Sequence, residues 1–147
     1  MIREALLYDI PKLHLIRNAV NENKLSDPDL IKQSDYEDFI TRRGKGWVYE
    51  MQGSIAGFAV VDLQENNVWA LFVHPDFEKL GIGRELHDKM LRWYFSHHHQ
   101  TLWLSTAPAT RAESFYRKAG WKETGLYGKG EIRFEMYPDI WVPVVSG

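Results

Sequence analysis

Residues 73–84 read Val73-His74-Pro75-Asp76-Phe77-Glu78-Lys79-Leu80-Gly81-Ile82-Gly83-Arg84, and they predict the end of a strand, a turn and a helix start. An apolar run precedes them, and apolar residues follow at helical spacing: Ile82, Leu86, Met90 and Tyr94. A helix start offers unpaired backbone N–H groups and a partial positive charge. Gly81 and Gly83 let an anion approach that backbone closely. The turn therefore predicts a site for a phosphate-like anion, with Lys79 and Arg84 adding positive charge.

Other interpretations of two glycines at this spacing must be weighed. A Walker A loop is excluded, because no Gly-Lys-Ser/Thr follows. A dinucleotide fingerprint is excluded as well, because Leu86 occupies the third glycine position of G-x-G-x-x-G. A plain helix start without a ligand stays open on the turn alone. The apolar strand before it and the amphipathic helix after it favour the anion site.

The elements around the turn predict a mixed α/β fold. Upstream, we expect a strand, a helix that starts at Asp9 with Pro11 in its first turn, a broken helical region, and a three-stranded antiparallel meander: 2–7, 10–20, 28–42, 47–51, 55–63 and 68–73. Downstream, we expect helix, strand, helix, strand and strand: 82–96, 101–105, 110–119, 121–129 and 131–137. The order predicts a mostly antiparallel central sheet flanked by helices. Residues 1–137 would form a single domain and residues 138–147 an apolar C-terminal extension.

Composition narrows the class of protein. The chain has 147 residues, about the size of one domain, and a formal net charge of −2. There is no basic excess that would indicate nucleic-acid binding. There are no cysteines, which excludes disulfides, thiolate metal sites and cysteine nucleophiles. Neither a signal peptide nor an apolar run of membrane-spanning length is visible. We expect a soluble, cytoplasmic protein without a nucleic-acid or membrane partner.

A second pattern lies further along the chain and gives the turn its context. It reads Ala112-Glu113-Ser114-Phe115-Tyr116-Arg117-Lys118-Ala119-Gly120-Trp121 and follows a predicted strand. This A-x-x-F-Y-x-x-x-G-aromatic pattern resembles motif B of the GNAT superfamily of N-acetyltransferases. Residues 73–84 resemble motif A of the same family. With the strand order, the resemblance covers the chain to about Tyr137, and the two motifs together are far more specific than either alone.

The resemblance implies how these segments bind acetyl-CoA. The backbone of Leu71, Phe72 and Val73 would pair with the pantetheine arm. The arm would pass between strands 68–73 and 101–105, which splay apart in this family. The backbone amides of the turn would hold the pyrophosphate, with residues Lys79, Leu80, Gly81, Ile82, Gly83 and Arg84. Ala112 and Tyr116 would contact the coenzyme from the motif B helix, with Tyr116 near the thioester sulfur.

Two positions depart from the family pattern. Glu78 stands where the family usually has Gln or Arg, and Ala109 stands where it often has Asn. A carboxylate beside a pyrophosphate is unfavourable, so we expect Glu78 to point away and Lys79 to compensate. Ala109 removes one polar contact to the pantetheine. Both departures keep open an alternative function, a non-catalytic domain that senses acyl-CoA.

Acetyl transfer to an amine needs a neutral nucleophile and a proton for the departing thiolate. A lysine-like amine with a pKa of about 10.4 is mostly protonated at pH 7, so a base would help. Tyr116 is the expected general acid, against the alternative of a tyrosine that only packs in the core. Glu50, on strand 47–51, is the expected base. The other candidates are His74, Asp62, Glu65 and His14.

The remaining expectations concern partners. The acceptor would be a primary amine of a small molecule or peptide. A cationic amine would suit five acidic residues near the first helices: Asp27, Asp29, Asp35, Glu37 and Asp38. Three consecutive histidines, His97–His99, cannot all face one ion from a regular helix or strand, so no metal site is expected.

The extension 138–147 carries five apolar residues that we expect to be covered from water: Ile140, Trp141, Val142, Val144 and Val145. Extension of the last strand, packing on its own domain and homodimer formation are all open hypotheses for it.

Overall fold

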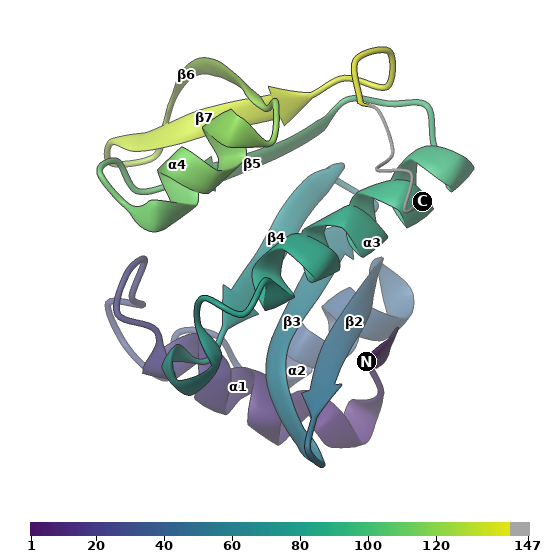
Figure 1. The fold of residues 1–147 in the computed structure, drawn as a ribbon, viewed down its shortest axis with the longest axis vertical. Helices are drawn as coiled ribbons and strands as arrows, with labels where there is room; N and C mark the ends of the chain where they lie inside the picture. The colour runs from purple at the N-terminus through teal and green to yellow at the C-terminus, as the bar shows by residue number, and fades with distance from the viewer. Residues whose placement is uncertain (142–147) are drawn as a thin grey trace.

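The computed structural model describes residues 1–141, whose strands form one sheet in the order β1-β2-β3-β4-β5-β7-β6 (Figure 1). The strands are β1 Ile2–Glu4, β2 Gly44–Met51, β3 Ser54–Asp62, β4 Asn67–Val73, β5 Leu102–Thr106, β6 Lys122–Tyr127 and β7 Glu131–Met136. The α-helices are α1 Ile10–Ala19, α2 Gln33–Glu37, α3 Ile82–His97 and α4 Arg111–Lys118. This order of elements confirms the mixed, mostly antiparallel α/β fold expected from the sequence.

The N-terminal segment differs from the expected strand over residues 2–7. Strand β1 ends at Glu4, and Leu7–Asp9 form a 3₁₀ turn. The Asp9 carboxylate accepts hydrogen bonds from the backbone N–H of Leu6 at 2.8 Å and from the Arg3 guanidinium at 2.8 and 2.9 Å. Asp9 does occupy the N-cap position of α1, but its side chain caps the preceding turn instead of the helix.

The second helical region is shorter than the predicted range 28–42. Asp27 Oδ1 accepts the N–H of Asp29 at 2.9 Å and holds a turn there, since aspartate favours such turns. Helix α2 begins only at Gln33, where the Asp35 carboxylate accepts the Lys32 N–H at 2.8 Å. A π-helical turn, Asp38–Arg42, follows and leads into β2.

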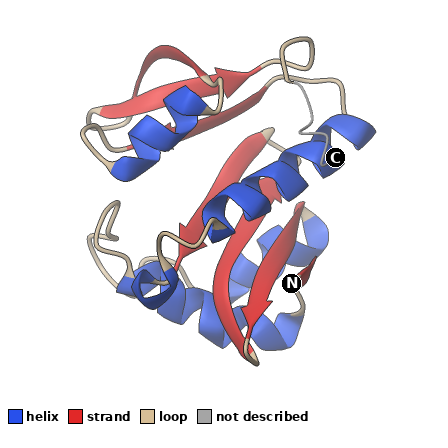
Figure 2. Ribbon diagram, viewed as in Figure 1, coloured by secondary structure: helices blue, strands red, loops and turns tan. Residues whose placement is uncertain are grey.

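Helices cover both faces of strands β2–β4 (Figure 2). Helix α3 packs its apolar face on one side, where Leu86, Met90 and Tyr94 are fully buried. Helix α1 packs Leu13 and Ile16 on the other side. Side chains of a strand alternate between these layers. The sheet is therefore buried on both faces, as its continuous apolar strands predict.

The sheet opens between β4 and β5. These two strands run parallel and pair only at Asn67 and Trp103, so they diverge beyond that point. Figure 1 shows β5, β6, β7 and α4 as an upper half that is separated from β2–β4 below. The splayed central strands expected from the sequence are thus confirmed. They place two strand edges on either side of an opening in the middle of the molecule.

The C-terminal extension is described only as far as Trp141. The Trp141 indole stacks on Phe95 of α3 with ring centroids 5.5 Å apart. The remaining residues of the extension, 142–147, lie outside the described residues. Within residues 1–141, no helix is long and apolar enough to cross a membrane.

Candidate active site

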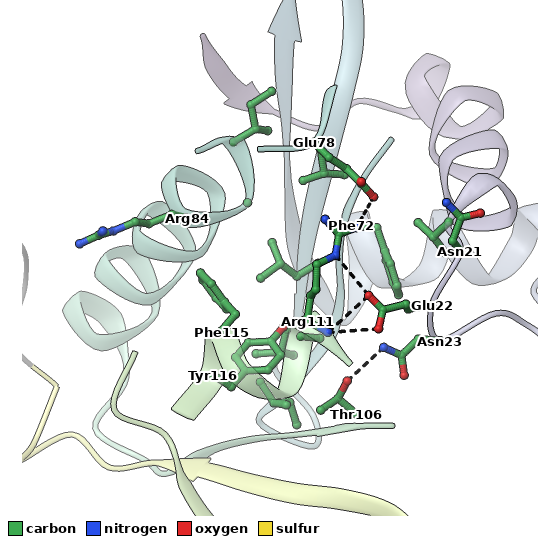
Figure 3. Close-up of a pocket in the computed structure, with 18 of the residues that line it drawn as sticks. Asn21, Glu22, Asn23, Phe72, Glu78, Arg84, Thr106, Arg111, Phe115 and Tyr116 are labelled. Carbon is green, nitrogen blue, oxygen red and sulfur yellow. Dashed lines mark hydrogen bonds and ion pairs between the residues drawn. The ribbon is translucent and has the colours of Figure 1, made fainter. Parts of the chain in front are cut away.

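A pocket of about 440 Å³ occupies the opening between β4 and β5 (Figure 3). Five segments line it: the loop after α1, the end of β4, the turn before α3, the end of β5 and the first turns of α4. The lining includes Val20–Asn23, Leu71–Val73, Phe77–Lys79, Gly81–Arg84, Leu104–Thr106, Arg111–Ala112 and Phe115–Tyr116. The volume suits a small-molecule or cofactor site.

The pocket exposes an unused edge of the sheet. Strand β4 pairs with β3 along its length, from Asn67 opposite Asp62 to Val73 opposite Gly57. On its other edge, the described residues give β4 a strand partner only at Asn67. Backbone N–H and C=O groups are obligatory hydrogen-bonding groups, and an open edge can accept an extended ligand as an added strand. The edge at Leu71–Val73 is therefore ready for such a ligand.

The turn before α3 forms the second wall. Gly81 takes the N-cap position with a left-handed φ of 80°, a conformation that glycine adopts without strain. The helix that follows is 16 residues long, so its first N–H groups carry the positive end of a full helix dipole. A Cβ on Gly83 would lie 3.5 Å from Val73 Cγ2 and would fill part of the approach to these groups. Residues 79–84 were expected to hold the pyrophosphate. Among these six, only Leu80 does not line the pocket, and its side chain is exposed.

Glu78 does not point away from the pocket, and Lys79 does not compensate its charge. Figure 3 shows the Glu78 carboxylate directed toward Arg111, whose Nη2 lies 2.6 Å from Glu78 Oε1. The Glu22 carboxylate accepts the Arg111 backbone N–H at 3.1 Å and lies 3.3 Å from its Nε. Hydrogen bonds to Glu78 and Glu22 raise the pKa of Arg111. The sequence-based expectation failed because Arg111 lies 33 residues beyond Glu78 and meets it only across the fold.

Tyr116 lines the pocket from α4. Thr110 Oγ1 accepts the N–H of Glu113 as a helix N-cap, and the Glu113 carboxylate accepts the N–H of Ala109, so both side chains fix the start of the helix. The Tyr116 ring packs edge-on against Phe115 and Trp121, with centroids 5.3 and 5.6 Å away. Burial raises the pKa of the Tyr116 hydroxyl well above its ordinary value. The hydroxyl is therefore neutral at physiological pH.

The candidate bases named from the sequence lie outside the pocket lining. Glu50 Oε1 accepts a hydrogen bond from Arg3 Nε at 2.5 Å. Strand β2, which carries Glu50, is separated from β4 by β3, so its predicted position facing the cleft is not found. Asp62 is buried in a bidentate pair with Arg43, at 3.1 and 2.6 Å.

Sequence reasoning missed two carboxylates near the pocket. Glu22 lines it directly and pairs with Arg111, as described above. Glu131, at the start of β7, does not itself line the pocket, but its Oε1 accepts a hydrogen bond at 2.6 Å from Oγ of Ser105, which does. The alternation in Glu131–Met136 does indicate that Glu131 faces away from the core. Only the pairing of β7 with β5 brings it to the cleft.

A second pocket, of about 410 Å³, lies between α3 and α4. Arg84 and Lys118 bring positive charge to it, and Trp141 from the C-terminal extension forms part of its wall. His87 is buried there, and its Nε2 accepts the indole N–H of Trp121 at 3.0 Å. Within residues 1–141, no three His, Asp or Glu side chains gather as a metal site requires.

Comparisons with known proteins agree with this geometry. A family model described as "Acetyltransferase (GNAT) family" matches residues 10–121. No curated protein sequence matches the chain. Among solved structures, the chain resembles a ribosomal-protein-alanine N-acetyltransferase from Brucella melitensis, with a TM-score of 0.76, 20% identity, and 93% of this chain and 99% of that chain covered.

Two further solved structures share the fold. The ribosomal-protein-S18-alanine N-acetyltransferase from Escherichia coli has a TM-score of 0.76 and 17% identity, with 99% of this chain and 97% of that chain covered. The PaiA N-acetyltransferase from Thermoplasma acidophilum, solved in complex with coenzyme A, has a TM-score of 0.80 and 14% identity, with 93% and 98% covered.

Proposed function

Because the chain belongs to the GNAT acetyltransferase family and is therefore an acetyl-CoA-dependent acyltransferase, we propose that it acetylates a primary amine by direct attack in a ternary complex. The acceptor is a small molecule or a peptide. The observation that carries the proposal is the pocket itself. It joins an unpaired strand edge, a glycine-flanked helix start and a buried tyrosine within one cavity.

Each wall of the pocket suits one part of acetyl-CoA. The open edge at Leu71–Val73 offers backbone groups to the amides of the pantetheine arm. The N–H groups at Gly81–Arg84 offer donors to the pyrophosphate. The cations of the second pocket, Arg84 and Lys118, suit the 3′-phosphate. When bound, acetyl-CoA supplies a thioester carbonyl that an amine can attack.

The chemistry then needs three proton transfers. The acceptor nitrogen must lose one proton before attack and a second as the amide forms, and the leaving thiolate must gain one as the carbon–sulfur bond breaks. Tyr116 is the proposed proton donor to the thiolate, because its hydroxyl is neutral and lies in the pocket. Glu50 has no support as the base from its position on β2.

The Arg111 pairs also bear on function. Two carboxylates, Glu22 and Glu78, lie in a pocket proposed to bind a polyanion, which by itself would favour a weak or non-catalytic binder. Arg111 neutralises part of this charge and can also turn toward a phosphate. A non-catalytic acyl-CoA sensor is therefore the second candidate function.

Two measurements separate these functions. Calorimetric titration with coenzyme A should give binding, and acetyl-CoA mixed with a panel of amines should release free thiol. Binding without thiol release from any amine would favour the sensor. Failure to bind coenzyme A would contradict both functions.

We also propose that residues 1–137 form a single catalytic domain, that the protein is cytoplasmic, and that it forms a homodimer through the extension 138–147. Deleting residues 139–147 and measuring mass by light scattering tests the homodimer. An unchanged dimer would show that the extension is not its interface.

A further inference from the structure

Arg17 presents a charge on the α1 side of the pocket that no carboxylate balances. Its Nη1 donates to the backbone carbonyl of Asn23 at 2.9 Å, and its guanidinium carbon lies 4.2 Å above the Phe72 ring. Within residues 1–141, no Asp or Glu lies at ion-pair distance from Arg17. Burial lowers the pKa of Arg17, whereas carboxylate partners raise those of Arg3 and Arg111.

Such a guanidinium is costly without a partner. It carries five N–H donors and stays charged in proteins. A half-buried charge is stabilised when a counter-ion joins it in planar, two-bond geometry, which is the geometry of a carboxylate. The free donors of Arg17 therefore suit a carboxylate that comes from outside the described residues.

Glu131 presents the opposite charge on the facing half of the sheet. Leu104 and Ile132 point from β5 and β7 into the core beneath α3, so Ser105 and Glu131 project to the other face. Ser105 lines the pocket, and its hydroxyl donates to Glu131 Oε1 at 2.6 Å. The described residues assign no partner to the second carboxylate oxygen of Glu131. That oxygen can accept a hydrogen bond from an ammonium group.

Arg17 and Glu131 both lie near the α1 side of the opening between β4 and β5. Phe72, which Arg17 covers, packs with the α1 cluster and lines the pocket on that side. Asn23, which Arg17 binds, reaches across to β5 and donates to Thr106 Oγ1 at 3.1 Å, next to Ser105. The negative charge of Glu131 also influences Arg17, opposing the effect of burial on its pKa. Arg17 thus lies against the pocket-lining residues Phe72 and Asn23, and Glu131 lies against the pocket-lining Ser105.

We propose that this pair of charges, Arg17 on α1 and Glu131 with Ser105 on the facing sheet, selects an acceptor that carries both an amine and a carboxylate, that is, an α-amino acid. This inference rests on the acetyltransferase function proposed above. Arg17 binds the carboxylate in a bidentate pair. Glu131 and Ser105 hold the ammonium group where the thioester carbonyl is reached.

The same arrangement supplies the missing base. The ammonium proton passes to Glu131, either directly or through the Ser105 hydroxyl, and leaves a neutral amine. The nitrogen then attacks the thioester carbonyl, the carbon–nitrogen bond forms and the carbon–sulfur bond breaks. The thiolate takes a proton from Tyr116, the nitrogen gives its second proton to the Tyr116 oxygen as the amide forms, and the proton on Glu131 passes to solvent. The products are an N-acetyl amino acid and coenzyme A, and no redox partner is needed.

The test compares acceptors that differ only in the carboxylate. Amino acids with small, aliphatic and aromatic side chains are each assayed beside the matching amide and the matching decarboxylated amine, with acetyl-CoA and free-thiol detection. We expect kcat/KM for one class of amino acid to exceed that of its amide and its amine by at least about tenfold. The comparison with the amide is demanding, because its amine is less basic and is more often neutral at pH 7.

Variants then assign the effect to the two charges. Arg17→Ala should raise KM for the amino acid and bring the ratio between amino acid and amine close to one, with KM for acetyl-CoA little changed. Arg17→Lys should keep part of the preference, which separates a charge effect from disruption of the loop. Glu131→Gln should lower kcat and require higher pH for the remaining activity. Arg42→Ala and Glu135→Gln are the matched controls, and both should keep the wild-type preference.

The outcomes distinguish this inference from the function on which it rests. Equal kcat/KM for amino acids and their amines, or an unchanged ratio in Arg17→Ala, would overturn the amino-acid site and leave an acetyltransferase. Better turnover of a short peptide than of any free amino acid would also overturn it. Thiol release from no amine at all would overturn the proposed function as well.

Discussion

Tyr116 is a single buried residue for which we propose a chemical role. Its ring is held by Phe115 and Trp121, and its burial raises the pKa of the hydroxyl. Tyr116→Phe keeps the packing and removes the proton donor. We expect kcat to fall about a hundredfold while coenzyme A binding, measured by calorimetry, is nearly unchanged.

The pH dependence of activity gives a second test of the proposed role of Tyr116. Because its pKa is raised, Tyr116 stays protonated on the alkaline side, so activity should not decline as pH approaches the ordinary tyrosine pKa of about 10. Tyr8→Phe, at an exposed tyrosine remote from the pocket, is the control and should keep wild-type kcat. Unchanged kcat in Tyr116→Phe would remove Tyr116 from the mechanism.

Arg111 offsets the negative charges of Glu22 and Glu78, and we expect it to determine whether this acidic pocket can bind an anion. Arg111→Ala leaves Glu22 and Glu78 uncompensated beside the proposed pyrophosphate, so coenzyme A should bind roughly tenfold more weakly. Glu78→Gln removes one repulsive charge and should bind coenzyme A more tightly than wild type. The double variant should lie between the two singles. Calorimetric Kd values in low and high salt measure this, and equal Kd values for all variants would show that Arg111 and Glu78 lie away from bound coenzyme.

Helix α3 is the element on which the proposed cofactor binding depends. Gly81 and Gly83, at the start of this helix, are required to be glycine for different physical reasons. Gly81 adopts a left-handed φ of 80° with open space around its Cα, whereas Gly83 sits within the helix against Val73. The first is required by the backbone and the second by the space that a ligand would occupy.

Alanine substitutions separate these reasons. Gly81→Ala should cost about 1 kcal/mol of folding free energy, because alanine is strained at that φ. Gly83→Ala should leave stability unchanged or raise it by up to about 1 kcal/mol, because alanine favours a helix. Gly83→Ala should nevertheless weaken coenzyme A binding, because its methyl group narrows the anion's approach. Urea unfolding and calorimetry measure both quantities, and wild-type affinity in Gly83→Ala would place the pyrophosphate elsewhere.

The sheet of the whole molecule consists of two halves, β1–β4 and β5–β7. They pair at one end of the opening and are bridged at the other end by one side chain, which we call the latch. The β4–β5 pairing at Asn67 and Trp103 forms the join. Asn23 forms the latch, because its side chain donates to Thr106 Oγ1 at 3.1 Å and accepts the Ala107 N–H at 2.9 Å. Asn23 also adopts a left-handed φ of 56°, which asparagine tolerates better than most residues.

Breaking the latch should therefore loosen the acceptor side of the molecule. Asn23→Ala loses two hydrogen bonds and introduces strain, so we expect about 2–3 kcal/mol of destabilisation. Asn23→Gly loses the same bonds without the strain and should be the milder change. In both variants, hydrogen exchange at residues 20–26 should accelerate and KM for the amine should rise more than KM for acetyl-CoA. Equal protection in wild type and Asn23→Gly would show that the latch does not hold the loop.

Much of the fold was predictable because its signals are local. Apolar spacing after Gly81 predicts α3, and the Thr110 cap and the Phe115-Tyr116 pair predict α4. Helix ends and strand starts shifted by a few residues where side chains such as Asp9 and Asp35 bond to the backbone. The cofactor segments were predictable for the same reason, since each is a short contiguous motif.

The sequence by itself determined the order of elements, the family and the two motifs proposed to bind the cofactor, because these depend on residues close together in the chain. Tertiary structure alone decided the charges of the site. Arg111 meets Glu78 and Glu22, and Ser105 meets Glu131, only because β5 is placed between β4 and β7. Such pairings depend on strand register and loop packing over long separations, which no local pattern specifies. The turn at Gly81 and Gly83 was therefore predictable from the sequence, whereas the proposed acceptor site depends on contacts that only the fold creates.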